Sequence, residues 1–235
     1  MMKLKLIDLI RIEYKKHKSK PYMIVIVIGT IICLLLSVFF SFIPKFDVNT
    51  SELNSITFIL KMNAMFIIGL FSFVLGAMFV KYIINPYSEL CLCKTLGYPV
   101  SRENIFLSKV LTCILFISTF CTISLITTDV ILYYGNIIFK VVENDLKHSL
   151  FMYEIGNLIY TLITVIGIGC LSLATGWIKK SPVILMVTNF ACYCMVGNQI
   201  QVNYIFIKII SILAALFIIA FSIIYLLKNV KKIEV

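Results

Sequence analysis

Long apolar runs separated by short polar segments dominate the pattern along this chain. A helix that crosses a membrane needs about 20 mostly apolar residues. Six runs reach or approach that length, and we expect a helix in each. They cover residues 23–42, 62–80, 110–128, 158–177, 182–196 and 204–227. The pattern predicts an all-α integral membrane protein with six transmembrane helices in a single transmembrane domain over residues 1–235.

The fifth run, residues 182–196, is short for a full crossing and is followed by a polar segment. The polar or helix-breaking residues of that segment are Gly197, Asn198, Gln199, Gln201 and Asn203. One interpretation is a re-entrant element between the fifth and sixth spans, which requires burial in protein or contact with water at that depth. The other is a plain polar loop, and the residues alone leave both open.

Residues 86–109, PYSELCLCKTLGYPVSRENIFLSK, form the long polar passage between the second and third runs. Pro86 ends the preceding helix, and Gly97 with Pro99 stops a short helix before the third run. Ser101 is placed to cap the helix that follows. This short helix is either a docking element for a soluble partner or a simple connector.

The first 20 residues carry seven Lys or Arg, too many for a signal peptide with a short apolar core. Four apolar residues share one helical face, opposite a charged face. They are Leu6, Ile7, Ile10 and Tyr14. This pattern predicts an amphipathic helix at the membrane interface, with a solvated basic tail as the alternative.

Composition excludes an ordinary soluble domain, since 61% of the residues are apolar and only 14% are charged. The net charge of +10 suggests anionic lipid rather than nucleic acid, because the basic residues flank the apolar runs. With the N-terminus inside, sixteen of the 21 basic residues lie on the inner side. The outer five are Lys45, Lys61, Lys140, Lys147 and Lys208. We therefore expect both termini and residues 86–109 to face the cytosol.

Neither a motor nor a catalytic centre is visible in the sequence. A phosphate-binding loop needs a Gly-Lys pair, and the chain contains none. His17 and His148 fall on opposite sides of the predicted membrane, so they cannot act together. The eight cysteines lack the spacing of a metal site, and we expect no metal and no catalytic residue.

Asp129 is the one acidic residue that this division of the chain leaves in a span, and Ser118 and Thr122 share its helical face. These three residues could line a translocation path. Alternatively, Asp129 lies at the outer headgroup level, where an ionised carboxylate costs little.

Small residues recur at steps of three and four in two of the runs. They are Gly69, Ser72 and Gly76 in the second run, and Gly169, Ser172 and Gly176 in the fourth. Such faces let helix backbones approach closely, so we expect them to mediate packing within a compact bundle.

The sequence LGYPVSRENIFLSK at residues 96–109 resembles the L-x-x-P-[VI]-S-R-x-x-I-x-x-[SA]-K passage of ABC-2 type transporter permeases. Glu89 stands where that family has an acidic residue upstream, whereas Leu90-Cys91 replaces its frequent Gly-Thr. In the family this passage includes the cytosolic coupling helix that contacts the ATP-binding subunit. An interfacial N-terminal helix and a re-entrant element before the last span also occur there.

The resemblance implies that the chain is the membrane subunit of an ATP-driven exporter and not itself an enzyme. Two permeases, identical or related, would stand on two ATP-binding subunits, which would hold ATP and Mg while this chain binds no cofactor. The residues expected to contact the ATP-binding subunit are Glu89, Lys94, Thr95, Leu96 and Arg102.

Small permeases of this appearance often export antimicrobial or amphipathic peptides, for secretion or self-immunity. The frequent Ile and Lys are typical of a Gram-positive bacterium, with the chain in its plasma membrane. The alternative functions are a non-transporting membrane sensor or assembly protein that binds a cytosolic partner, and a membrane enzyme.

Overall fold

A computed structural model describes residues 9–11, 13, 20–43, 55–87, 102–143, 150–197, 199 and 205–231. The described chain is almost entirely helical, which confirms the all-α prediction. Its α-helices are α2 (Lys20–Phe42), α3 (Ile56–Phe79), α5 (Arg102–Phe139), α6 (Leu150–Lys179), α7 (Pro182–Val196) and α8 (Ile205–Lys231). Helix α3 continues as the π-helix η3 (Val80–Ile84) and the 3₁₀-helix η4 (Asn85–Tyr87).

Five helical segments in the described residues are long and apolar enough to cross a membrane. They are Lys20–Phe42, Ile56–Ile84, Glu103–Phe139, Tyr153–Lys179 and Lys208–Asn229. Helix α7 has 15 residues, or about 22 Å at 1.5 Å per residue, against a hydrocarbon core of about 30 Å. The helices are compatible with a multi-pass membrane protein, and a sixth crossing at α7 stays a prediction.

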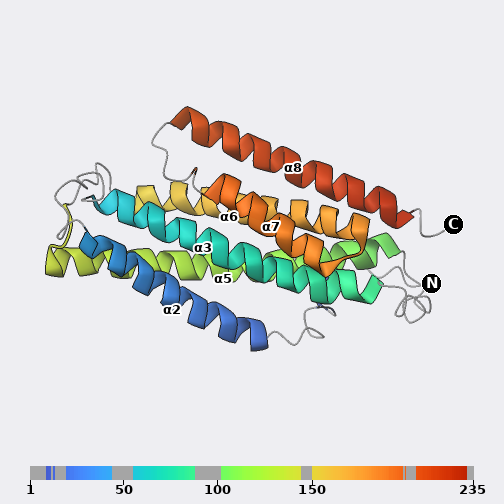
Figure 1. Ribbon diagram of the computed structural model, residues 1–235, viewed down its shortest axis with the longest axis horizontal. Helices are drawn as coiled ribbons and strands as arrows, with labels where there is room; N and C mark the ends of the chain where they lie inside the picture. Colours follow the sequence, from blue (N-terminus) through green and yellow to red (C-terminus); the bar gives the residue numbers. More distant parts are fainter. Residues whose placement is uncertain are drawn as a thin grey trace.

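Helix α3 lies at the centre of the bundle, with α2 on one side and α6 and α7 on the other (Figure 1). Its most apolar window is 67% buried, whereas the windows of α2 and α8, at opposite edges of the bundle, are each 17% buried. The exposed side chains of α2 and α8 are largely Ile, Leu, Val and Phe. These two edges therefore have the surface expected of helices in contact with lipid.

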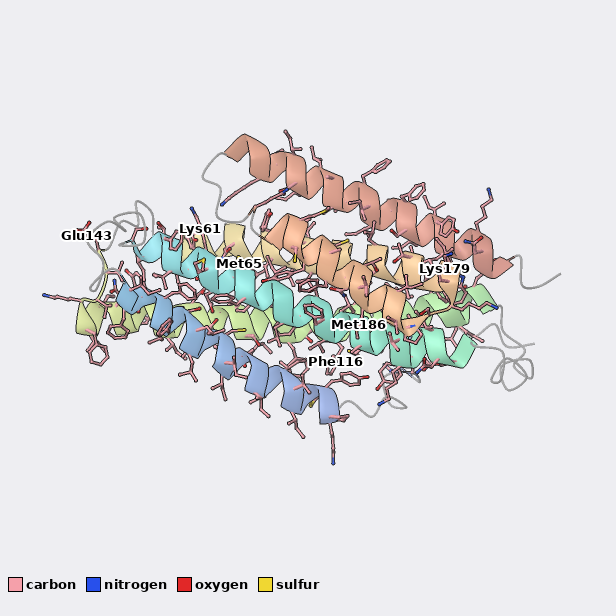
Figure 2. All side chains as sticks on the ribbon, viewed as in Figure 1. Lys61, Met65, Phe116, Glu143, Lys179 and Met186 are labelled. Carbon is pink, nitrogen blue, oxygen red and sulfur yellow. The ribbon has the colours of Figure 1, made fainter. Side chains whose placement is uncertain are left out.

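Basic residues gather at one end of the bundle, which we call the basic end. There α2, α5 and α7 begin, and η4, α6 and α8 end (Figure 1). Lys179 lies at this end, whereas Lys61 and Glu143 lie at the opposite end (Figure 2). The described basic residues near the basic end are Lys20, Lys81, Arg102, Lys109, Lys179, Lys180, Lys228 and Lys231.

Local polar contacts fix the helix termini at the opposite end. Ser55 caps α3 by accepting a hydrogen bond from the Phe58 amide at 3.3 Å. The Ile56 amide donates to the Glu143 carbonyl at 3.0 Å, which joins the start of α3 to the segment after α5. Asn136 closes that segment, because its side chain donates to the Val142 carbonyl and accepts from the Val142 amide.

The stripe of small residues on α3 faces α7. A Cβ added at Gly69 would lie 2.9 Å from Cζ of Tyr193, and one at Gly76 would lie 2.7 Å from Nδ2 of Asn189. Between them, the Ser72 carbonyl accepts a hydrogen bond from Asn189 at 2.8 Å.

The stripe on α6 faces α3 and α7. A Cβ at Gly169 would collide with Leu75, and one at Gly176 would lie 2.7 Å from Cβ of Leu185. Ser172, between them, is fully buried. Glycine at these positions is what allows α3, α6 and α7 to approach so closely.

Two helices extend well beyond the apolar runs that predicted them. Helix α5 has 38 residues, about 57 Å, and continues past Thr128 to Phe139. Helix α6 begins at Leu150 rather than Leu158, so it includes Glu154 and Asn157. Both extensions contain polar residues that lower local hydropathy, and one pair joins the two helices, since Asn157 of α6 donates to Asp129 of α5 at 3.4 Å.

Two predicted elements fall mostly or partly outside the described residues. Of the interfacial helix predicted over residues 1–20, residues 9–11, 13 and 20 are described, and all are helical. The coupling region 86–109 is described at residues 86–87 and 102–109. Its ends are the 3₁₀ turn η4 and the start of α5.

Candidate functional site

A buried group of polar side chains links four helices. We call it the polar cluster, and all its members are at most 8% exposed. It consists of Ser37 from α2, Asn63 from α3, Thr128 and Asp129 from α5, and Glu154 and Asn157 from α6. The cluster lies nearer the opposite end than the basic end, since Asn63 is only two turns inside the start of α3.

Asn63 is at the centre of the cluster. Its amide nitrogen donates to the Thr128 hydroxyl at 2.7 Å and to Oδ1 of Asp129 at 2.6 Å, which uses both N–H groups. Its amide oxygen accepts from the Ser37 hydroxyl at 3.2 Å. One side chain of the central helix therefore ties α3 to both α2 and α5.

Asp129 is fully buried and is held from two sides. Besides the bond from Asn63, its Oδ2 accepts from the Asn157 amide at 3.4 Å. Glu154 lies one turn before Asn157 on the same face of α6, which places its carboxyl on the side of α6 that faces Asp129. Two carboxyl groups thus meet inside the bundle, and both amides that reach Asp129 belong to other helices.

Glu154 differs from Asp129 in its surroundings. Its side chain is 8% exposed, and neither carboxyl oxygen receives a hydrogen bond from a described donor. A buried polar atom without a donor costs about 1–3 kcal/mol, and more if it is charged. Glu154 is therefore the member of the cluster whose carboxyl oxygens lack hydrogen-bond donors among the described residues.

The structure does not bring Ser118 and Thr122 to Asp129. Their hydroxyls donate to carbonyls of their own helix, Ser118 to Leu115 and Thr122 to Thr119. Although the three residues share a face, eleven and seven residues of α-helix separate the first two from Asp129 by about 16 and 10 Å along the axis. Asp129 itself is enclosed by protein, and a translocation path along this face stays a prediction.

Of the residues predicted to contact an ATP-binding subunit, Glu89, Lys94, Thr95 and Leu96 lie outside the described residues. Arg102 is the first residue of α5. The described elements that border the predicted docking segment, η4 and the start of α5, lie at the basic end of the bundle (Figure 1).

Aromatic contacts pack the helices that border this segment. The Lys81 ammonium lies 5.2 Å from the ring centroid of Tyr22 and 5.5 Å from that of Tyr82, which joins η3 to the start of α2. Phe106 meets Trp177 edge to face at 5.2 Å, which joins the start of α5 to the end of α6. A π-helix such as η3 often accompanies a functional site.

Sequence reasoning found Asp129 but missed Asn63, Asn157 and Glu154. Asp129 is not the only acidic residue in a membrane-length helix, because Glu154 lies inside the apolar segment Tyr153–Lys179. A signal for it exists on α6, where four buried polar residues recur on one face at steps of three and four. They are Glu154, Asn157, Thr161 and Thr164.

Among the described residues, no group of three or more His, Cys, Asp or Glu could hold a metal ion. The described cysteines are all free, and Cys33, Cys113, Cys121 and Cys170 are buried in the bundle. Cys91 and Cys93 lie outside the described residues.

Two largely apolar cavities flank the helices. One of about 370 Å³ lies between α6, α7 and α8 and is lined by residues such as Ile168, Met195 and Ile218. The other, of about 290 Å³, lies between α2, α3 and α5 near the opposite end.

No family model, no curated protein and no solved structure matches this chain.

Proposed function

We propose that this chain is the permease subunit of an ATP-driven exporter of the ABC-2 type, powered by a separate ATP-binding subunit. The observation that carries the proposal is where the segment resembling the family's docking passage is attached. It connects α3, the most buried helix of the bundle, to α5, the longest. A force applied there acts on the core of the molecule rather than on a peripheral helix.

Helix α3, with its continuation η3, contacts α5 at both ends, as transmission of a force along the two helices requires. At the basic end, Ile83 and Ile84 of η3 and Phe106 and Val110 of α5 belong to one buried apolar cluster. Toward the opposite end, Asn63 binds Thr128 and Asp129. Because both ends are fixed, movement of the docking segment would shift α3 and α5 as a unit.

In the proposed cycle, ATP binding closes the motor dimer and changes the relative free energies of the inward-open and outward-open permease. The docking segment must contact the motor differently in the two states, since a partner shifts an equilibrium only through differential contacts. Arg102 would contribute a charge-assisted hydrogen bond, with Glu89, Lys94, Thr95 and Leu96 completing the surface.

The proposed cargo is an antimicrobial or amphipathic peptide, exported for secretion or self-immunity. The cavity between α6, α7 and α8 supports an apolar cargo, because its lining is dominated by aliphatic side chains. A second permease, identical or related, would complete the path. In this proposal the chain lies in the plasma membrane of a Gram-positive bacterium, with both termini and the basic end in the cytosol.

Joint substitution of Leu96 and Arg102 by Ala tests the docking assignment. We expect the variant permease to fold and reach the membrane, but to lose the ATP-binding subunit on purification. The matched control is Lys179→Ala, which removes an exposed positive charge from the same end of the bundle. It should retain the ATPase.

Two results would count against this proposal. If the double variant keeps a stoichiometric and fully active ATPase, the docking site lies elsewhere. If the unsubstituted chain purifies with a cytosolic protein that lacks a phosphate-binding loop, and with no ATPase, the chain is a sensor or assembly protein instead.

A further inference from the structure

The polar cluster contains two carboxyl groups, but its described hydrogen-bond donors bind only one of them. Asp129 receives hydrogen bonds from two amides, Asn63 at 2.6 Å and Asn157 at 3.4 Å. Glu154, one turn from Asn157 on the face of α6 that meets Asp129, receives none from the described residues. Asp129 therefore has the surroundings of an ionised carboxylate, and Glu154 has the surroundings of a neutral acid.

No described positive charge compensates a second ionised carboxyl. The described donors to Asp129 are the amides of Asn63 and Asn157, and no described basic side chain donates a hydrogen bond to Glu154. The hydroxyl of Tyr153, beside Glu154 on α6, donates to the Thr57 carbonyl at 3.4 Å. Two buried carboxylates in contact repel strongly, so one of them must bind a proton or share a cation.

We propose that Asp129 and Glu154 form a buried proton-binding site, in which a single proton on Glu154 is donated to a carboxylate oxygen of Asp129. The arrangement gives each group a partner: the Glu154 hydroxyl has an acceptor, and Asp129 gains a third donor beside Asn63 and Asn157. A metal-type cation fits less well, because the two amides direct N–H groups, not carbonyl oxygens, at Asp129.

The site connects protonation to helix packing. Glu154 is on α6 and Asp129 is on α5, so the shared proton forms a bond between these two helices. Removing it leaves two anions in contact inside the protein, which favours separation of α5 from α6 and entry of water. This role concerns a different end of the molecule from the proposed docking segment and does not depend on an ATPase.

Infrared spectroscopy of the purified full-length chain in lipid tests the proposal. Water-exposed carboxyls are ionised at neutral pH, so a carboxylic acid C=O band there reports a buried proton. We expect one such band, which shifts when glutamate is labelled with ¹³C but not when aspartate is labelled. It should disappear in Glu154→Gln and persist in Glu143→Gln, which removes an exposed carboxyl.

The labelling experiment needs no substitution, so it remains decisive even if Glu154→Gln does not fold. Absence of the band in the unsubstituted protein at neutral pH overturns the proposal. A band that follows the aspartate label overturns the assignment of Glu154 as donor. A band that appears only when sodium is replaced by a bulky organic cation shows a cation site in place of a proton site.

Discussion

Asn63 acts on two neighbouring residues of α5 through a single amide group. Its two N–H groups reach Thr128 and Asp129, and its oxygen accepts from Ser37. An amide suits this position because it both donates and accepts, whereas an aliphatic side chain of similar size does neither. Asn63 therefore supplies the polar contact of α3 with α5 near the opposite end, beside the buried apolar packing of Ile59 and Leu60 against Leu132.

Replacing Asn63 by Leu should destabilise the protein more than any other single change in the polar cluster outside the two carboxyls. Asp129 loses its shorter hydrogen bond and stays buried, at a cost of about 1.5–3 kcal/mol for a charged group. The comparison is Ser37→Ala, which removes a neutral hydroxyl shared between the Cys33 carbonyl at 2.9 Å and Asn63 at 3.2 Å and should cost about 0.5–1.5 kcal/mol. Denaturant unfolding in detergent measures both, and equal losses would show that Asp129 does not depend on Asn63.

Helix α6 illustrates what can be read from sequence at the scale of an element and what cannot. Hydropathy located its apolar part and its small-residue face, because both are properties of local sequence. It placed the start of the helix too late, because Glu154 and Asn157 lower the mean hydropathy. The partner of Asn157 is Asp129, which is 28 residues away in sequence, so no local window could include this contact.

The small-residue face of α6 makes a prediction that can be tested within one helix. A Cβ at Gly176 would lie 2.7 Å from Cβ of Leu185, an atom fixed to the backbone of α7. Gly176→Ala should therefore cost about 1–3 kcal/mol, the usual range for overpacking. Gly156 on the same helix has nothing within 4 Å, so Gly156→Ala should be neutral or stabilise by about 0.5–1 kcal/mol.

Thermal unfolding of the two variants in the same detergent gives the comparison directly. If Gly176→Ala unfolds at the same temperature as Gly156→Ala, then α6 and α7 do not pack as closely as described. If the unfolding temperature falls in both variants, alanine itself is unfavourable on α6.

At the scale of the whole molecule, apolar helices at the edges enclose a central helix, α3, that makes polar contacts at more than one position along its length. Helix α3 binds α5 through Asn63 and α7 through the Ser72 carbonyl. The apolar runs and the clustering of basic residues at helix ends could be predicted from sequence. The central position of α3 could not, because its run is no more apolar than those of α2 and α8 at the edges.

The central claim is that the bundle receives force from a separate ATPase at the segment between η4 and α5. A photoreactive amino acid in place of Leu96, activated in intact cells, tests it most directly. The matched control carries the same group in place of Lys140, after α5 at the opposite end. We expect the group at position 96 to form a covalent adduct with a protein containing a phosphate-binding loop, and the group at position 140 to form none. An adduct with extracellular or purely membrane proteins at position 96, or ATPase adducts only at position 140, would contradict the account.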